Sequence, residues 1–177
     1  MKKLSFLICV LVLLLAGCSS QKSTKDNFQV SAYIGNKQIK LQQVDVNTDD
    51  LLDKDVDQDI NFDTEKKIFT PLFDNKTIAK FDDEITVEFE KEYENAIVYD
   101  HLLTEDGYGC FNRSINQYDL TIDSDTHTAK IKLSEHPAAA LSSDSSFLTD
   151  QEIRGFRIVL QDSSKTFEYA FIINIVK

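Results

Sequence analysis

The last part of the chain alternates apolar and polar side chains with a period of two over two long segments. The apolar faces consist of Phe156, Ile158 and Leu160 in the first segment and of Phe167, Tyr169, Phe171, Ile173 and Ile175 in the second. Successive side chains of a β-strand point to opposite faces, so each segment is predicted to be a strand with one buried face. Between them, residues 162–165 (Asp-Ser-Ser-Lys) predict a turn. We therefore expect a C-terminal β-hairpin whose long second strand is central to the fold.

The same alternation recurs upstream. It places three apolar sets on buried faces, namely Ile85, Val87 and Phe89; Tyr118, Leu120 and Ile122; and Ala129, Ile131 and Leu133. Gly35-Asn36 separates two further mixed segments and predicts a hairpin turn. Residues 96–103 form a mixed apolar run that favours a central strand.

One short helix is predicted near residues 149–154. Thr149 and Glu152 have the spacing of a capping box, and Gly155 follows where a helix often ends in a left-handed cap. About nine short strands, one helical turn and no alternation of strands with long helices predict an all-β fold. We expect a single domain over residues 28–177, an antiparallel two-sheet sandwich with an immunoglobulin-like topology as first choice. A barrel or a mixed α+β sheet remains an alternative.

The N-terminus has the three zones of an export signal. Lys2 and Lys3 precede an apolar run from Leu4 to Leu15, which is shorter than the ~20 residues of a membrane-spanning helix. The next residues, Leu15-Ala16-Gly17-Cys18, resemble the lipobox of bacterial lipoproteins. The resemblance implies that residues 1–17 are a signal peptide cleaved between Gly17 and Cys18. It also implies a diacylglyceryl thioether on the Cys18 sulfur and an N-acyl chain, such as palmitate, on its amine.

This resemblance sets the expected location of the protein. Two or more acyl chains attach a protein stably to a membrane, whereas one chain is marginal. Residues 18–27 comprise the lipidated cysteine and a polar segment without apolar side chains, which is typical of a flexible tether. We expect an extracytoplasmic protein, anchored by lipid to a bacterial cell membrane.

The net charge limits the classes of partner, and the cysteine content limits the disulfides that can form. Loss of the two lysines in the signal changes the net charge from −11 to −13. That charge argues against nucleic acid and against broad adhesion to anionic headgroups, and it favours cationic partners. After lipidation of Cys18, the mature chain retains Cys110 as its one free cysteine, so no intramolecular disulfide is expected.

An acidic segment, residues 45–65, contains the only candidate metal ligands. These candidates for calcium are Asp53, Asp55, Asp57 and Asp59. Their alternate spacing matches the start of a calcium loop. Gln58 stands where such loops need glycine, however, and Thr64 stands where they need a bidentate glutamate. A solvated acidic loop is therefore the main interpretation, and we expect no cofactor besides the lipid.

No catalytic residues are assigned from the sequence. Cys110 lies in a loop with two glycines, but the spacing brings none of His101, His127 and His136 to its sulfur. The histidines also lack metal-ligand spacing. The leading hypothesis is a non-catalytic binding module at the cell envelope, whose partner is an envelope protein or polymer bound through residues 104–112 and the acidic segment. The alternatives are an envelope hydrolase, a calcium-dependent structural or adhesive domain, and a carrier with a deep apolar cavity.

Overall fold

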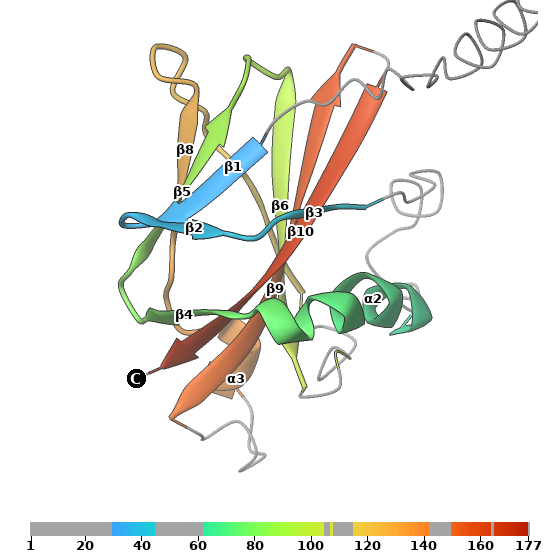
Figure 1. Cartoon of the computed structure of the whole chain (residues 1–177), viewed down its shortest axis with the longest axis vertical. Coiled ribbons are helices and arrows are strands. Elements are labelled where there is room, and N and C mark those ends of the chain that lie inside the picture. Colours follow the sequence, from blue (N-terminus) through green and yellow to red (C-terminus); the bar gives the residue numbers. More distant parts are fainter. Residues whose placement is uncertain are drawn as a thin grey trace, which may run out of the picture.

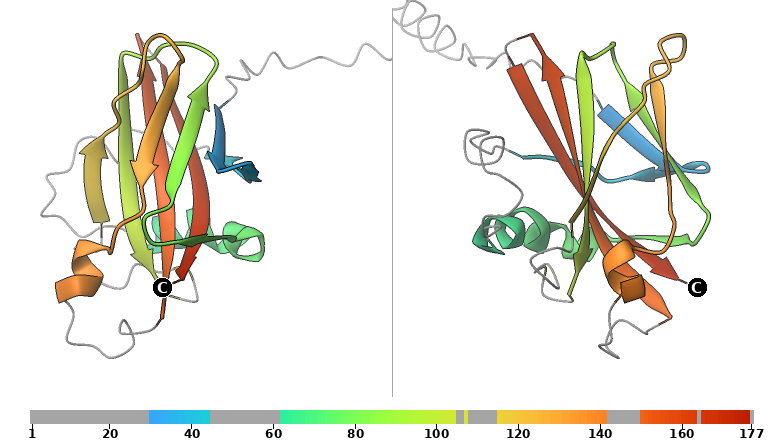
Figure 2. Two further views of the ribbon diagram at one scale, coloured as in Figure 1. Left: turned by 90° about the vertical axis from the view of Figure 1, so that its left-hand side faces the viewer. Right: turned by 180° about the vertical axis from the view of Figure 1, so that it is seen from behind.

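The computed structural model describes residues 30–44, 62–104, 107, 115–141, 150–163 and 165–176. These residues form two β-sheets packed face to face (Figures 1 and 2). One sheet has four strands in the order β2-β1-β5-β8. The other has six strands, in the order β3-β10-β9-β6-β7 with β4 also paired to β10. The predicted all-β sandwich is confirmed, while its immunoglobulin-like topology stays a prediction.

The four-stranded sheet is wholly antiparallel. Its members are β1 (Val30–Ile34), β2 (Lys37–Ile39), β5 (Glu84–Phe89) and β8 (Thr128–Lys132). The predicted turn at Gly35-Asn36 joins β1 to β2, and Gly35 has a φ of +56°, in the left-handed region that glycine adopts without strain.

The six-stranded sheet is built around the C-terminal hairpin. Its members are β3 (Gln42–Gln43), β4 (Thr77–Lys80), β6 (Asn95–Leu103), β7 (Ile115–Asp119), β9 (Gln151–Asp162) and β10 (Lys165–Val176). β9 and β10 pair along their full lengths, from Asp162 opposite Lys165 to Gln151 opposite Val176. β4 runs parallel to β10, the one parallel pairing among the described strands. The predictions of a central final strand and a central 96–103 strand are confirmed.

The main core lies between the two sheets and contains the apolar faces that the alternation predicted. Ile85, Val87 and Ile131 from the four-stranded sheet meet Phe156, Ile158, Leu160, Phe171 and Ile173 from the six-stranded one. The rings of Phe156 and Phe171 stack with their centroids 5.1 Å apart. Fully burying each large apolar side chain contributes ~1.5–3 kcal/mol, so this layer is the principal source of stability.

The helix predicted at residues 149–154 is wrong. The chain is already extended at Gln151, where β9 begins, and Glu152 and Arg154 face the interior. Gly155 lies mid-strand, opposite His101 and Ile172, and caps no helix. A Cβ on Gly155 would lie 2.6 Å from the Phe69 ring, so glycine is needed because that ring packs directly on the sheet. Cross-strand pairing outweighs a local capping signal here.

Three helical segments stand where the sequence predicted none: α2 (Phe62–Phe69), the 3₁₀ helix η2 (Thr70–Asn75) and α3 (Pro137–Leu141). Ile68, Phe69 and Leu72 pack on the outer face of the six-stranded sheet and form a second, smaller core with Ala170 and Ile172. Figure 2 shows α2 and α3 on opposite sides of the same end of the sandwich. Helices this short depend on tertiary packing, so periodicity does not reveal them. None of the helices in the described ranges has the length and apolar character to cross a membrane.

Candidate functional site

Buried ionisable side chains gather around one point of β6, at Asp100 and His101. Asp100 shares the inner face of the strand with Ala96 and Val98, whereas His101 shares the outer face with Leu103. Both side chains are buried. A charged residue placed in such surroundings must find a partner, because burying an unpaired charge costs several kcal/mol.

The inner group is centred on Arg154 of β9. Its Nε donates to Oδ1 of Asp100 at 2.8 Å, and its Nη2 donates to the second oxygen of the same carboxylate. Nη1 donates to the carbonyl oxygen of Ser134 at 2.6 Å. The guanidinium therefore binds Asp100 through two parallel hydrogen bonds, the strongest geometry for this ion pair. It also ties β6 and β9 to the segment that follows β8.

A second carboxylate, that of Glu152, completes the inner group. Its Oε2 lies 3.4 Å from Nη1 of Arg154 and accepts the backbone N–H of His136 at 3.3 Å. Burial raises the pKa of Glu152 above its ordinary value, and the nearby Arg154 partly offsets that rise. Two carboxylates thus share one guanidinium.

His136 joins the start of α3 to β6. Its Nε2 donates to the carbonyl oxygen of Asp100 at 3.2 Å, and its Nδ1 accepts the backbone N–H of Ala138 at 3.1 Å. A carbonyl can only accept and an amide N–H can only donate, so the ring is the neutral tautomer with its proton on Nε2. Burial lowers the pKa of His136 below the usual histidine value.

The outer group joins α2 to β6. Nδ1 of His101 donates to Oε1 of Glu65 at 3.0 Å, and the Phe69 ring meets the imidazole edge-on with centroids 5.2 Å apart. The His101 side chain is 0% exposed. Burial lowers the pKa of His101, although the Glu65 carboxylate acts in the opposite direction. Within the described residues the Nε2 atom of His101 has no hydrogen-bond partner.

A second buried ion pair lies on the same outer face. Nε of Arg157 donates to Oε1 of Glu168, and the guanidinium lies over the Tyr99 ring, 5.3 Å from its centroid. Stacking on an aromatic face is favourable for arginine and leaves its edge free to bind a carboxylate. Three ionisable pairs are therefore buried on strands β6, β9 and β10 or against them: Asp100–Arg154, Glu65–His101 and Glu168–Arg157.

In this conformation the buried pairs connect elements of the fold. A carboxylate bonded to one nitrogen of a histidine is an arrangement that also orients catalytic bases. A base must reach its substrate, however, and the His101 ring is fully buried. Among the residues the structure describes, no three His, Cys, Asp or Glu side chains are grouped so as to hold a metal ion.

Most residues singled out from the sequence lie outside the described ranges. They are Gly17, Cys18, Asp53, Asp55, Asp57, Asp59 and Cys110. Glu65, the last residue of the acidic segment, lies in α2 and is buried, so the interpretation as a solvated loop is wrong for that residue. His127 lies in the turn before β8 with a φ of +52°. The structure brings the His136 ring to the backbone of Asp100, next to His101 on β6. The spacing of the histidines in the chain did not indicate this proximity.

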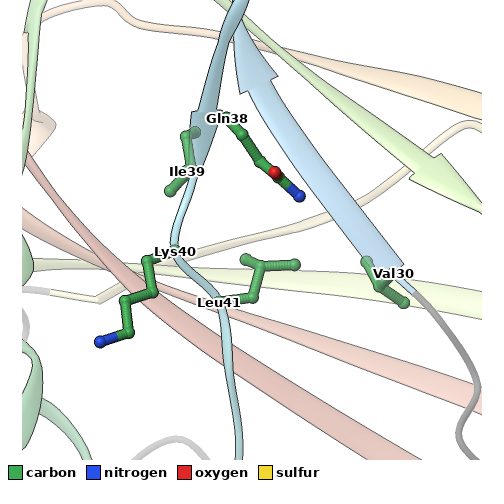
Figure 3. A pocket seen from close by; sticks show the side chains of 5 residues that line it. All are labelled: Val30, Gln38, Ile39, Lys40 and Leu41. Carbon is green, nitrogen blue, oxygen red and sulfur yellow. The ribbon is translucent and has the colours of Figure 1, made fainter.

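A shallow hollow of about 380 Å³ opens beside the β1–β2 hairpin (Figure 3). It is lined by Val30, Gln38, Ile39, Lys40 and Leu41. Leu41 points toward Val30, whereas Lys40 extends in the opposite direction. With an amide and an ammonium among its lining groups, this hollow is not the deep apolar cavity expected of a small-ligand carrier.

Comparison of the chain with models of known protein families and with curated proteins found no match.

Proposed function

We propose that this chain is a bacterial lipoprotein whose β-sandwich is a non-catalytic binding module, displayed on the outer side of a cell membrane. The observation that carries the proposal is the sequence Leu15-Ala16-Gly17-Cys18 at the end of an apolar run preceded by two lysines. Small residues before a cysteine at that position are what the lipoprotein-processing peptidase requires. The diacylglyceryl and N-acyl chains on Cys18 then hold the protein at the membrane.

The tether proposed for residues 18–27 sets how far from the membrane the domain can reach a partner. Fully extended, the chain between Cys18 and Val30 spans at most ~40 Å. The acidic body repels an anionic bilayer surface, so the lipid is the attachment and the domain stays in the aqueous phase. Such a module reaches partners within a few nanometres of the membrane.

The proposed partner is an envelope protein or polymer that carries positive charge. The net charge of the mature chain supports this choice, because complementary charge accelerates encounter and excludes anionic partners. We place the contact surface at residues 104–112 and at the acidic segment 45–65 apart from the buried Glu65, since segments that connect the strands of a rigid sandwich commonly bind partners.

Fractionation of producing cells tests the anchor, and crosslinking tests the partner. The wild-type protein is expected in the membrane fraction at its processed size and labelled by a radioactive fatty acid, whereas Cys18→Ala should accumulate as an unlabelled, uncleaved precursor. The matched control Cys110→Ala should stay with the membrane. Crosslinking followed by pull-down should recover one defined envelope component, and the yield should fall when salt screens the charges. Fatty-acid labelling or normal processing of Cys18→Ala would refute the anchor, and repeated recovery of no envelope component would refute the binding role.

A further inference from the structure

His136 uses both ring nitrogens to hold α3 against the sheet. Through Nδ1 it accepts the N–H of Ala138, one of the amides at the start of α3 that have no partner within the helix. Through Nε2 it donates to the carbonyl oxygen of Asp100 in β6. The imidazole is therefore at once the N-terminal cap of the helix and its link to the sheet.

Among the described residues, α3 has few other ties to the sheet, one of which is the hydrogen bond from the backbone N–H of His136 to Glu152. The helix has five residues, of which Ala139 is the one that is buried, and Leu141 at its end is 88% exposed. A helix of this length is not stable by itself in water. Pro137 favours a helix start, and its side chain is exposed. The hydrogen bonds of His136 are thus the principal attachment of the segment.

Protonation of the ring is incompatible with this arrangement. A proton on Nδ1 turns that atom into a donor, and it then faces the N–H of Ala138, which is also a donor. The cap is lost and two N–H groups point at each other. The ring can relieve this conflict only by leaving its site, and α3 must move with it.

The ionisable groups around His136 act in different directions. They are Asp100 and His101 of β6, Tyr118 of β7, Glu152 and Arg154 of β9, and Glu135, which precedes His136 in the chain. Asp100 favours the protonated ring, whereas Arg154 and His101 oppose it, and burial opposes it most. Arg154 binds both oxygens of the Asp100 carboxylate, and the His136 ring bonds the Asp100 backbone carbonyl instead.

We propose that His136 is a proton-operated latch: in its neutral form it fastens α3 to β6, and on protonation it releases α3 while the sandwich stays folded. The release exposes the start of α3 and the Asp100 carbonyl. This device goes beyond the proposed binding function and does not depend on the lipid anchor.

Amide hydrogen exchange of the purified protein tests the latch. We expect the protection factors of the amides at residues 138–141, corrected for intrinsic exchange, to fall up to ~30-fold between pH 7.5 and 5.0. The fall reaches this limit if the histidine has its ordinary pKa, near 6.5, when α3 is released and binds no proton when α3 is attached. Amides in β6 and β9 should stay far better protected than those of α3 at both pH values and should lose only what the fall in global stability requires. Nitrogen chemical shifts of His136 at pH 7.5 should report the Nε2–H tautomer.

Two variants complete the design. His136→Asn places a carboxamide oxygen near Nδ1, where it caps the helix but does not titrate, so the pH dependence at α3 should disappear. The matched control His127→Asn removes a histidine at a left-handed position that asparagine tolerates, and should leave the dependence unchanged. The proposal is overturned if α3 is unprotected at pH 7.5, if its protection does not change with pH, or if His136→Asn shows the same fall. It is also overturned if the amides of β6 and β9 are no better protected than those of α3 at pH 5.0, because α3 would then open only with the whole fold.

Discussion

Asp100 and His101 are neighbours on β6, yet the side chain of each binds a group on a different face of the six-stranded sheet. The Asp100 carboxylate holds Arg154 inside the sandwich, and the His101 ring holds Glu65 of α2 outside it. The alternation of a strand makes this possible, because consecutive side chains point in opposite directions. One peptide unit thereby connects the inner ion-pair group to the helix that covers the outer face.

Removing only one partner of the Asp100–Arg154 ion pair is expected to destabilise the fold strongly. Arg154→Met leaves the Asp100 carboxylate buried without its bidentate partner, and the free energy of unfolding should fall by ~3–5 kcal/mol. Denaturant unfolding at pH 7.5 measures this change. The exposed pair Lys130–Glu84 supplies the matched control: Lys130→Met should cost at most ~1 kcal/mol.

Removing all three charges of the inner group should restore much of that loss. In the triple variant Asp100→Leu, Glu152→Gln and Arg154→Met no buried charge of this group is left unpaired, so its stability should exceed that of Arg154→Met. A single variant as stable as the wild type would show that water reaches the pair and that the two side chains are not a buried attachment between β6 and β9.

Gly155→Ala should destabilise the packing of α2. The added methyl group would lie 2.6 Å from the Phe69 ring and 2.8 Å from a methyl of Leu103, and both of these side chains are buried. Overpacking of this kind typically costs ~1–3 kcal/mol. Combining it with Phe69→Leu should recover part of the loss, since the smaller side chain vacates the site of the clash. Thermal unfolding of the two variants measures both effects, and a neutral Gly155→Ala would mean that α2 does not rest on this strand.

Stability should decrease as the pH falls below about 6.5. Burial lowers the pKa of both His101 and His136, so the unfolded chain binds protons in a range where the folded chain does not. Each histidine then destabilises the fold by up to ~1.4 kcal/mol per pH unit, between its unfolded pKa and its lower folded pKa. Denaturant unfolding at pH 7.5 and 5.5 should show a loss of up to ~2–3 kcal/mol.

The contribution of the two histidines to the pH dependence of stability can be measured separately from that of Glu152. The double variant His101→Gln with His136→Asn should remove most of this pH dependence. Glu152 acts in the opposite sense: its raised pKa lets the folded state hold a proton above the unfolded pKa, so stability is gained as the pH falls through that range. Glu152→Gln should therefore steepen the loss, and a stability that rises from pH 7.5 to 5.5 in the wild type would contradict the assignment.

The sequence predicts the sheets well because their signal is local. Alternation at Ile85, Val87 and Phe89, and along residues 156–175, follows directly from burial on one face of a strand. It predicts the helices poorly, since α2 is stabilised by contacts with β9 and β10 that are far away in the chain. The false helix at 149–154 shows the same point, because Glu152 and Gly155 lie in β9, a strand that pairs with β10 on one side and with β6 on the other.

The buried ionisable groups are visible in the sequence, although rules based on the spacing of metal ligands or catalytic residues do not detect them. Asp100 and His101 interrupt an apolar run, and Arg154 and Arg157 interrupt another. Charged residues within strands buried on both faces require partners, so interruptions of this kind indicate a group of buried ion pairs. Which residues pair depends on strand order and register, and only the fold supplies these.

Mass spectrometry of the mature N-terminus tests the central claim most directly. The account predicts a polypeptide that begins at Cys18 and carries a diacylglyceryl thioether on its sulfur, with a further acyl chain where the amine is modified. The Cys18→Ala variant should lack this mass and retain residues 1–17. A wild-type protein that keeps Met1, or that begins at Cys18 with an unmodified thiol, would contradict the assignment of this chain as a lipid-anchored envelope protein.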